Sequence, residues 1–253
     1  MDLDPDLAAL RPLGGFFVLR TLRGTAGDPP PVLPTLAQVY AKVPETASSD
    51  VYRDSLTFRV RKVVRALRAP EERIGASVAQ QGLAARLWSA ALGCAVLYGR
   101  IPDLDPRLLR WDADGGAPDD LWLTEVRARP GDAATLAAAV LDGHLEPLSA
   151  ALRARHPVAP GLLRGNAASA LAGAARQLEQ WARAHARPEV AARTRALTAE
   201  LFAHPLLADT GTLTGTAFRR RSCCLYYRAP GGGVCGDCCF TRPPRSSPRA
   251  PSG

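Results

Sequence analysis

Apolar residues recur at helical spacing along most of the chain, which predicts a mainly helical protein. The clearest case is residues 77–98, where one apolar stripe repeats every three to four positions. Gly99 and then Pro102 follow the last turn and mark its end. The stripe consists of Leu83, Leu87, Ala91, Cys94 and Tyr98. Similar patterns predict helices over residues 50–67, 132–142, 144–155, 166–186 and 188–202.

Two short segments predict a small β-sheet beside the helices. Residues 121–126 alternate apolar with polar side chains, as a half-buried strand does, and residues 16–19 form a short apolar run. Residues 24–34 contain three consecutive prolines, which lack the N–H group that a helix or central strand needs, so this stretch is expected to be a loop. The predicted fold class is therefore mainly α with a small β-sheet.

The pattern divides the chain into three parts. Residues 1–203 form the helical body, and residues 204–240 form a cysteine-rich segment. Residues 241–253 are rich in proline, serine and arginine and have almost nothing to bury, so this tail is expected to be disordered.

Composition and charge exclude several classes of protein. With 47% hydrophobic and 22% charged residues in a chain of 253, the composition is that of a soluble globular protein. The acidic start lacks the order of a secretory signal, and the longest apolar stretch, residues 83–98, is interrupted by Arg86 and too short for a bilayer. We therefore expect a cytoplasmic protein.

The net charge of +8 comes almost entirely from arginine, since only Lys42 and Lys62 are lysine. Residues 204–253 contain seven arginines against two aspartates, so about +5 of the charge lies in the part that also holds the cysteines. No nucleic-acid-binding motif accompanies these arginines, and a nucleic-acid partner is not expected.

Five of the six cysteines lie within residues 223–239, and four of them spell Cys-Cys-x10-Cys-x2-Cys. A Cys-x2-Cys pair places two sulfurs on one side of a tight turn, for which Gly236 supplies backbone freedom. Three glycines at 231–233 let the intervening loop fold back toward the adjacent pair. Four thiolates are the ligand set of iron–sulfur clusters. The candidate ligands are Cys223, Cys224, Cys235 and Cys238.

Three interpretations of these cysteines compete. A 2Fe–2S cluster fits four thiolates, whereas a structural zinc site usually takes two spaced pairs, and an adjacent Cys-Cys suits one tetrahedral ion less well. A disulfide framework is disfavoured in the cytoplasm. A Rieske-type centre is excluded, because none of the four histidines lies among the cysteines. Cys239 is a fifth thiol, expected to be free beside the site although it could substitute as a ligand, and Cys94 is expected in the core.

The segments Arg221-Ser222-Cys223-Cys224-Leu225-Tyr226-Tyr227-Arg228 and Gly233-Val234-Cys235-Gly236-Asp237-Cys238 closely resemble the FhuF-like ferric-siderophore reductase family. Weaker likenesses lie upstream, at residues 82–89, 144–148 and 165–171, in the family's order. Cys239 departs from the family's pattern. The resemblance implies a 2Fe–2S cluster on the four candidate cysteines and one-electron reduction of iron(III) held in a siderophore.

An oxidoreductase of this kind would need a ferredoxin or flavoprotein as electron donor, because no nucleotide-binding fingerprint is present. A peripheral contact with a membrane siderophore importer is left open. The main alternative is a zinc-stapled helical binding module without redox activity. A siderophore-biosynthesis ligase domain and a DNA-binding iron–sulfur sensor are further alternatives, which the missing nucleotide-binding part and the lack of a helix-turn-helix disfavour.

Three residues outside the cysteines are candidates for substrate contact. Arg86 lies beside the apolar stripe and is expected to form an ion pair or to face a substrate carboxylate or hydroxamate. Asn166 is expected to cap the helix that starts there, or to present that helix N-terminus to an anionic ligand. Arg228 follows the first cysteine pair, after Tyr226 and Tyr227, which are expected to shield the cluster from water.

Overall fold

The computed structural model describes residues 7, 9–22, 33–41 and 54–244. Most of the predicted loop at 24–34, the first residues of the predicted helix at 50–67 and most of the predicted tail at 241–253 lie outside these ranges. The protein is mainly helical with small sheets, as the sequence predicts. The main helices are α2 (Leu36–Tyr40), α3 (Ser55–Leu67), α4 (Glu72–Tyr98), α5 (Ala133–Leu136), α6 (Glu146–Arg155), α7 (Pro160–Ala184) and α8 (Pro188–Phe202).

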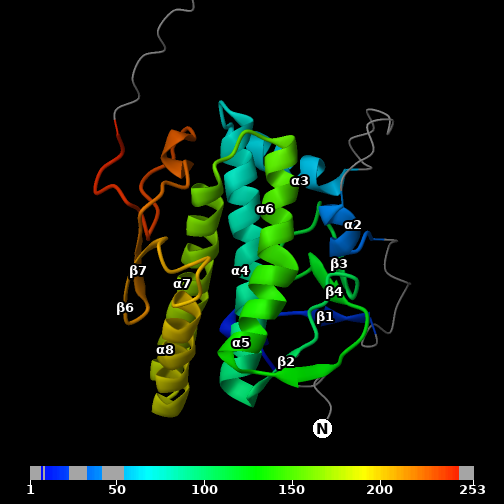
Figure 1. Ribbon diagram of the computed structural model, residues 1–253, viewed down its shortest axis with the longest axis vertical. Coiled ribbons are helices and arrows are strands. Elements are labelled where there is room, and N and C mark those ends of the chain that lie inside the picture. Colours follow the sequence, from blue (N-terminus) through cyan, green and yellow to red (C-terminus); the bar gives the residue numbers. More distant parts are fainter. Residues whose placement is uncertain (1–6, 8, 23–32, 42–53, 245–253) are drawn as a thin grey trace, which may run out of the picture.

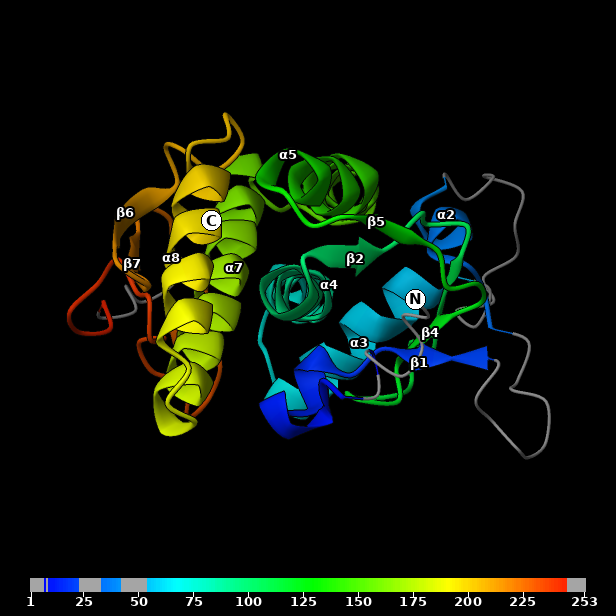
Figure 2. The same cartoon turned by 90° about the horizontal axis from the view of Figure 1, so that it is seen from below.

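Helix α4 runs through the centre of the molecule. In Figure 2 it is seen end-on, with α7 and α8 on one side, α3 on the other and the rod that ends in α6 beside it. Its residues are buried on nearly every face, so the apolar stripe predicted for residues 77–98 is only part of its buried surface. Alanines and glycines allow this close packing: a Cβ atom on Gly75 would lie 2.3 Å from the Val64 side chain in α3.

Helix α7 begins at Pro160, six residues earlier than the sequence predicts. Proline fits the first turn of a helix because its missing N–H would have no partner there. The prediction that Asn166 caps this helix is therefore wrong, and Asn166 lies in the second turn. Helix α8 has the predicted bounds.

The two helices predicted at 132–142 and 144–155 form one continuous rod. Helix α5 passes directly into a π-helical segment, η5 (Ala137–Leu145), and then into α6. Pro147, the second residue of α6, comes just after the π-helical segment and has no N–H to donate to the turn before it.

In the described part of the chain, three small sheets lie beside the helices. Strands β1 (Arg20–Thr21), β4 (Leu121–Leu123) and β3 (Leu109–Trp111) form the first, in the order β1-β4-β3 with β1 parallel and β3 antiparallel to β4. Antiparallel pairs form the other two. They are β2 (Arg100–Pro102) with β5 (Ala128–Pro130), and β6 (Gly211–Thr214) with β7 (Ala217–Arg220).

The prediction of a strand at residues 16–19 is wrong. A 3-10 turn, η2 (Gly15–Phe17), occupies this position, and only the two-residue strand β1 follows it. The reason is Arg86 in α4, whose guanidinium donates hydrogen bonds to the carbonyl oxygens of Gly15, Phe16 and Val18. Those carbonyls are then not available for a sheet ladder.

The β6–β7 hairpin lies along α7 and α8 (Figure 1). Residues 221–240, called the cysteine segment from here on, continue from it. The small sheets β1-β4-β3 and β2-β5 lie on the other side of α4 in both views. In the part of the chain that the structure describes, no helix combines the length and apolarity needed to span a membrane. The division of the chain at residue 204 stays a prediction.

Candidate metal centre

The cysteine segment is anchored at the end of strand β7. The backbone N–H of Arg220, the last residue of β7, donates to the carbonyl oxygen of Asp237 at 3.0 Å, so the far end of the segment returns beside its start. The next N–H, from Arg221, donates to the carbonyl oxygen of Thr210. The loop between the two cysteine pairs is therefore closed by backbone contacts to the hairpin.

Glycines let the loop fold back, as the sequence predicts. Gly231 has φ +72°, a left-handed conformation that glycine adopts without cost. Gly232 donates to the carbonyl oxygen of Ala229, and a Cβ atom there would lie 2.2 Å from the carbonyl oxygen of Tyr226. At the second pair, the N–H of Cys238 donates to the carbonyl oxygen of Cys235 at 3.0 Å, which makes the expected tight turn.

This folding brings the two cysteine pairs together. The sulfurs of Cys224 and Cys235 are 3.6 Å apart, although ten residues separate them in the sequence. Cys224 is buried, and the other three candidate ligands are half-buried.

One cysteine of each pair receives a backbone hydrogen bond from the residue two positions ahead. The N–H of Leu225 donates to Cys223 Sγ at 3.2 Å, and that of Phe240 donates to Cys238 Sγ at 3.4 Å. The N–H groups of Tyr226 and Asp237 favour the thiolate forms of Cys224 and Cys235. Hydrogen bonds of this kind stabilise thiolates and are one means by which proteins set the potential of an iron–sulfur cluster.

The thiols influence one another's ionisation. The pKa of Cys223 is lowered because its thiolate accepts a hydrogen bond from Cys224, and the pKa of Cys224 is raised by the same interaction. The pKa of Cys235 is raised by its contact with the Cys224 thiol and by burial. Like charges this close oppose one another, so four thiolates require a cationic centre among them. The donor set thus fits a metal cluster.

Among the residues that the structure describes, no three His, Cys, Asp or Glu side chains gather as ligands of a single ion would. A 2Fe–2S cluster needs a different arrangement, in which each of two irons takes two protein ligands. This segment supplies four cysteines, the number that such a cluster needs.

These features define the segment as an iron–sulfur-binding turn of the four-cysteine class. Residues 220–240 match the family model for the FhuF 2Fe-2S C-terminal domain. The match confirms the resemblance predicted from the cysteine motif, over 21 of the 253 residues, and identifies the cofactor as a 2Fe–2S cluster in preference to zinc. A search of curated proteins finds no match for the chain.

Arg86 is placed away from the cysteines, in the middle of α4. Its side chain is buried, and its Nε donates to the carboxylate of Asp120 at 2.7 Å. The guanidinium also donates to three backbone carbonyl oxygens. Arg86 therefore forms a buried ion pair, which was one of the two roles predicted for it. A role in substrate contact has no support from this placement.

Asn166 is fully buried and points toward the cysteine segment. Its Nδ2 donates to the carbonyl oxygen and the hydroxyl of Ser77 in α4, at 2.9 and 3.0 Å. Its Oδ1 accepts from Nη2 of Arg220 at 2.7 Å. The hydroxyl of Ser77 in turn donates to the carbonyl oxygen of Cys224 at 2.8 Å. Asn166 therefore belongs to a buried network that ties the first cysteine pair to α4 and α7.

Arg228 lies on the surface of the segment. Its Nη1 pairs with Glu71, just before α4, at 2.8 Å, and its Nε donates to the hydroxyl of Tyr227. The ring of Tyr227 packs edge-on against Phe240, whereas Tyr226 is exposed. Only one of the two tyrosines thus contacts another ring of the segment, and the shielding role of the pair stays a prediction.

The other cysteines differ from the four candidates. Cys94 is fully buried among apolar residues of α4, as expected. Cys239 is half-buried beside Cys238, and burial raises the pKa of its thiol.

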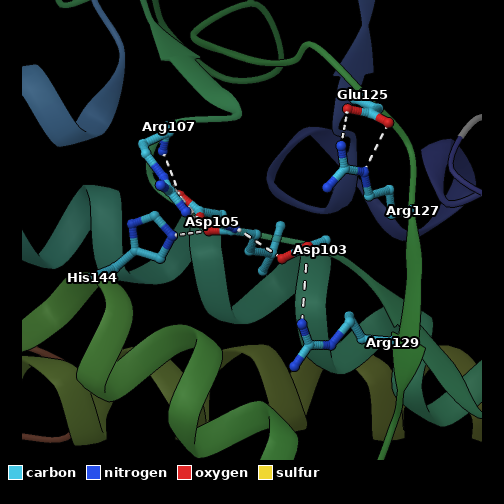
Figure 3. Close-up of polar contacts among 8 residues, drawn as sticks. Asp103, Asp105, Arg107, Glu125, Arg127, Arg129 and His144 are labelled. Atoms are coloured by element: carbon cyan, nitrogen blue, oxygen red, sulfur yellow. Dashed lines mark hydrogen bonds and ion pairs between the residues drawn. The ribbon is translucent and has the colours of Figure 1, made fainter.

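A second group of charged residues lies at the small sheets, on the other side of α4 (Figure 3). Asp105 pairs with Arg107, Glu125 with Arg127, and Asp103 with Arg129. Figure 3 shows His144 beside Asp105. Nε2 of His144 lies 2.5 Å from the carbonyl oxygen of Leu104. These charges pair locally and contribute nothing to the cysteine site.

Sequence reasoning missed Arg220, Ser77 and Gly165. Strand β7 alternates exposed and buried positions, and this alternation places Phe218 and Arg220 on the inner face. That period would have identified Arg220 as a buried residue. Gly165 lies against Arg220 and Ser222. A Cβ atom on Gly165 would lie 2.2 Å from Ser222 Oγ and 3.0 Å from Nη2 of Arg220.

Proposed function

We propose that this protein is a cytoplasmic oxidoreductase that reduces ferric siderophores by one electron and releases iron(II). The observation that carries the proposal is the closed four-cysteine segment, in which one sulfur of each pair accepts a hydrogen bond from a backbone N–H. We assign Cys223, Cys224, Cys235 and Cys238 as the cluster ligands.

A bound 2Fe–2S cluster supplies single electrons, which is the stoichiometry that one iron(III) requires. Iron(III) is a hard cation that the oxygen ligands of hydroxamates and catecholates bind very tightly. One added electron gives iron(II), which these ligands bind more weakly, so the metal leaves without any protein bond being made or broken.

The surface around the cysteines is suited to contact with other molecules. Three large apolar side chains of the segment are exposed, and they are Tyr226, Val234 and Phe240. Exposed arginines flank them at positions 219, 221, 228 and 242. A basic rim attracts an anionic ferric complex or an acidic donor protein, and the attraction weakens with salt.

A ferredoxin or flavoprotein is proposed as the electron donor. A contact with a siderophore importer at the inner face of the membrane would place the substrate at this rim as it enters, and it stays a prediction.

The proposal is tested in two steps, starting with the metal. Anaerobically purified protein is expected to hold two irons and two sulfides per chain, about as many as one cluster needs, with a spin-half EPR signal after dithionite. Stoichiometric zinc without a visible chromophore, even after reconstitution, would contradict the cluster and support the zinc-stapled module.

The second step tests the reaction. Protein reduced with one equivalent of electrons is mixed with a ferric trihydroxamate in the presence of an iron(II) chelator. One iron(II) should appear for each reduced cluster that is oxidised, and a Cys235→Ser protein should yield none. A cluster that stays reduced in excess substrate would exclude the reductase function and leave the iron–sulfur assignment standing.

A further inference from the structure

Arg220 carries a buried positive charge next to the cysteine segment. Only 2% of its surface is exposed. Its Nη2 donates to the carbonyl oxygen of Leu162 and to Oδ1 of Asn166, both of which are uncharged. Its Nε and Nη1 are buried and have no hydrogen-bond partner among the residues that the structure describes.

No carboxylate in the described part of the chain pairs with this guanidinium. Asp237 lies closest along the segment, since its carbonyl oxygen accepts from the backbone N–H of Arg220. Its carboxylate, however, forms an ion pair with Arg176 at 2.8 Å and accepts a hydrogen bond from the hydroxyl of Ser169. The charge of Arg220 is therefore left without an opposite charge from the side chains that surround it.

An uncompensated buried charge costs several kcal/mol, and proteins keep one only where another group balances it. The contacts around Arg220 lead to both cysteine pairs. Asn166, which accepts from Arg220, donates to Ser77, whose hydroxyl donates to the carbonyl oxygen of Cys224. The backbone N–H of Arg220 donates to the carbonyl oxygen of Asp237, which stands between Cys235 and Cys238.

We infer that Arg220 is the fixed counter-charge of the 2Fe–2S cluster and a positioning residue that raises its reduction potential. A cluster held by four thiolates is negatively charged and gains one more negative charge when a donor reduces it. A buried cation beside it stabilises the reduced form more than the oxidised form, and the two free N–H groups can donate to sulfur.

Arginine suits this role better than lysine because its planar group makes several directed hydrogen bonds at once. Here one nitrogen is held by α7 through Leu162 and Asn166, which fixes the orientation of the other two. Asn166 is fixed in turn by Ser77, the residue that holds the carbonyl oxygen of Cys224. The counter-charge and the first cysteine pair are thus held by one network.

The inference rests on the assigned cysteine ligands and not on siderophore reduction. Iron and sulfide counts on the unaltered protein test the ligands, and the potential of variants tests Arg220, so the two can fail separately.

The test is a redox titration of loaded Arg220→Gln, Arg220→Lys and Arg221→Gln proteins. Arg221 is the matched control, because it is the next residue, is largely exposed and pairs with Asp209. Arg220→Gln should lower the midpoint potential by at least the equivalent of a tenfold loss in relative stability of the reduced cluster, which is about 59 mV for one electron.

Arg220→Lys should recover most of that shift, and Arg221→Gln should change the potential by less than a third of it. High salt should suppress the effect at Arg221 and leave the effect at Arg220, because buried charges are screened less. Equal potentials for Arg220→Gln and unaltered protein, or equal shifts for the two glutamine variants, would overturn the inference.

If Arg220→Gln fails to hold the cluster, the midpoint potential of an Asn166→Asp variant tests the inference in its place. It leaves Arg220 in place but gives the guanidinium a carboxylate partner at the position of Oδ1. The potential should again fall, and an unchanged potential in loaded Asn166→Asp protein would overturn the inference.

Discussion

Ser77 in the second turn of α4 donates its hydroxyl hydrogen bond to the carbonyl oxygen of Cys224, 147 residues further along the chain and 2.8 Å away. Both groups are buried. The first cysteine pair is therefore fixed to the central helix as well as to its own hairpin, and the stability of the site should depend on a residue far from it in sequence.

Ser77→Ala should weaken this connection. It removes the donor to Cys224 and one acceptor of Asn166, and each buried polar group left unsatisfied costs about 1–3 kcal/mol. We expect a lower free energy of unfolding in urea and faster loss of iron to a chelator. Ser89→Ala, another buried serine of α4, is the control. Equal rates of iron loss for the two variants would contradict the role of Ser77.

Gly165→Ala tests the close approach of the segment to α7. The new methyl group would lie 2.2 Å from Ser222 Oγ and 3.0 Å from Nη2 of Arg220. Overpacking of this kind costs about 1–3 kcal/mol and should displace the start of the cysteine segment. We expect a lower melting temperature and a changed visible spectrum.

The matched control is Gly173→Ala in the same helix, where the nearest atom to a new Cβ is the end of a flexible arginine, 3.9 Å away. Alanine favours a helix interior by about 1 kcal/mol over glycine, so this variant should be more stable than the parent. Destabilisation by both substitutions would show that helix packing in general, and not the segment, is responsible.

Single serine replacements test the four assigned ligands. Replacement of any one of Cys223, Cys224, Cys235 and Cys238 should abolish or strongly alter the 2Fe–2S absorption and EPR spectra and lower the iron content. Cys239→Ser should leave both unchanged, because the two cysteine pairs already supply the four sulfurs that one cluster needs. Normal spectra for one ligand variant and loss of the cluster in Cys239→Ser would show that Cys239 is a ligand in its place.

The cysteine spacing and helical periodicity were enough to predict the class of site and most helices. The reason is local: a Cys-x2-Cys turn, a glycine loop and an apolar repeat each depend on a few neighbouring residues. The most specific part of the resemblance to the FhuF-like family rests on the same short stretch, and the match at residues 220–240 confirms it. The weaker likenesses at residues 82–89, 144–148 and 165–171 stay predictions.

What the sequence did not predict depends on contacts between distant residues. The run at 16–19 forms a turn because Arg86, about 70 residues away, binds its carbonyls. Asn166 looked like a cap because Gly165 precedes it, but that glycine serves the close approach of β7 within a helix that begins at Pro160. Arg220 looked like one of many surface arginines until the alternation of its strand placed it inside.

The buried His144 should make the stability of the fold depend on pH. Burial lowers its pKa from 6.5 to about 4, while Nδ1 lies 2.9 Å from the hydroxyl of Tyr40 and Nε2 contacts the carbonyl oxygen of Leu104. Asp105 faces the ring as well, and Arg107 holds the pKa of this carboxyl at about 2, so it stays charged throughout.

Between pH 6.5 and about 4 the unfolded chain binds a proton at His144 that the folded protein does not. The free energy of unfolding therefore falls as pH falls through this window, by up to about 3 kcal/mol in total. Above this window His144 makes no contribution to the pH dependence of stability. His144→Gln cannot titrate and should lose this slope, although it is less stable at neutral pH.

Urea unfolding followed by far-UV circular dichroism, at about pH 7 and about pH 5, measures the slope as the difference between variant and parent, so acid effects on the cluster cancel. His185→Gln is the control, because His185 is exposed at the end of α7 and stacks on Trp181. An equal loss of stability on acidification in the parent and in His144→Gln would show that another group causes the pH dependence.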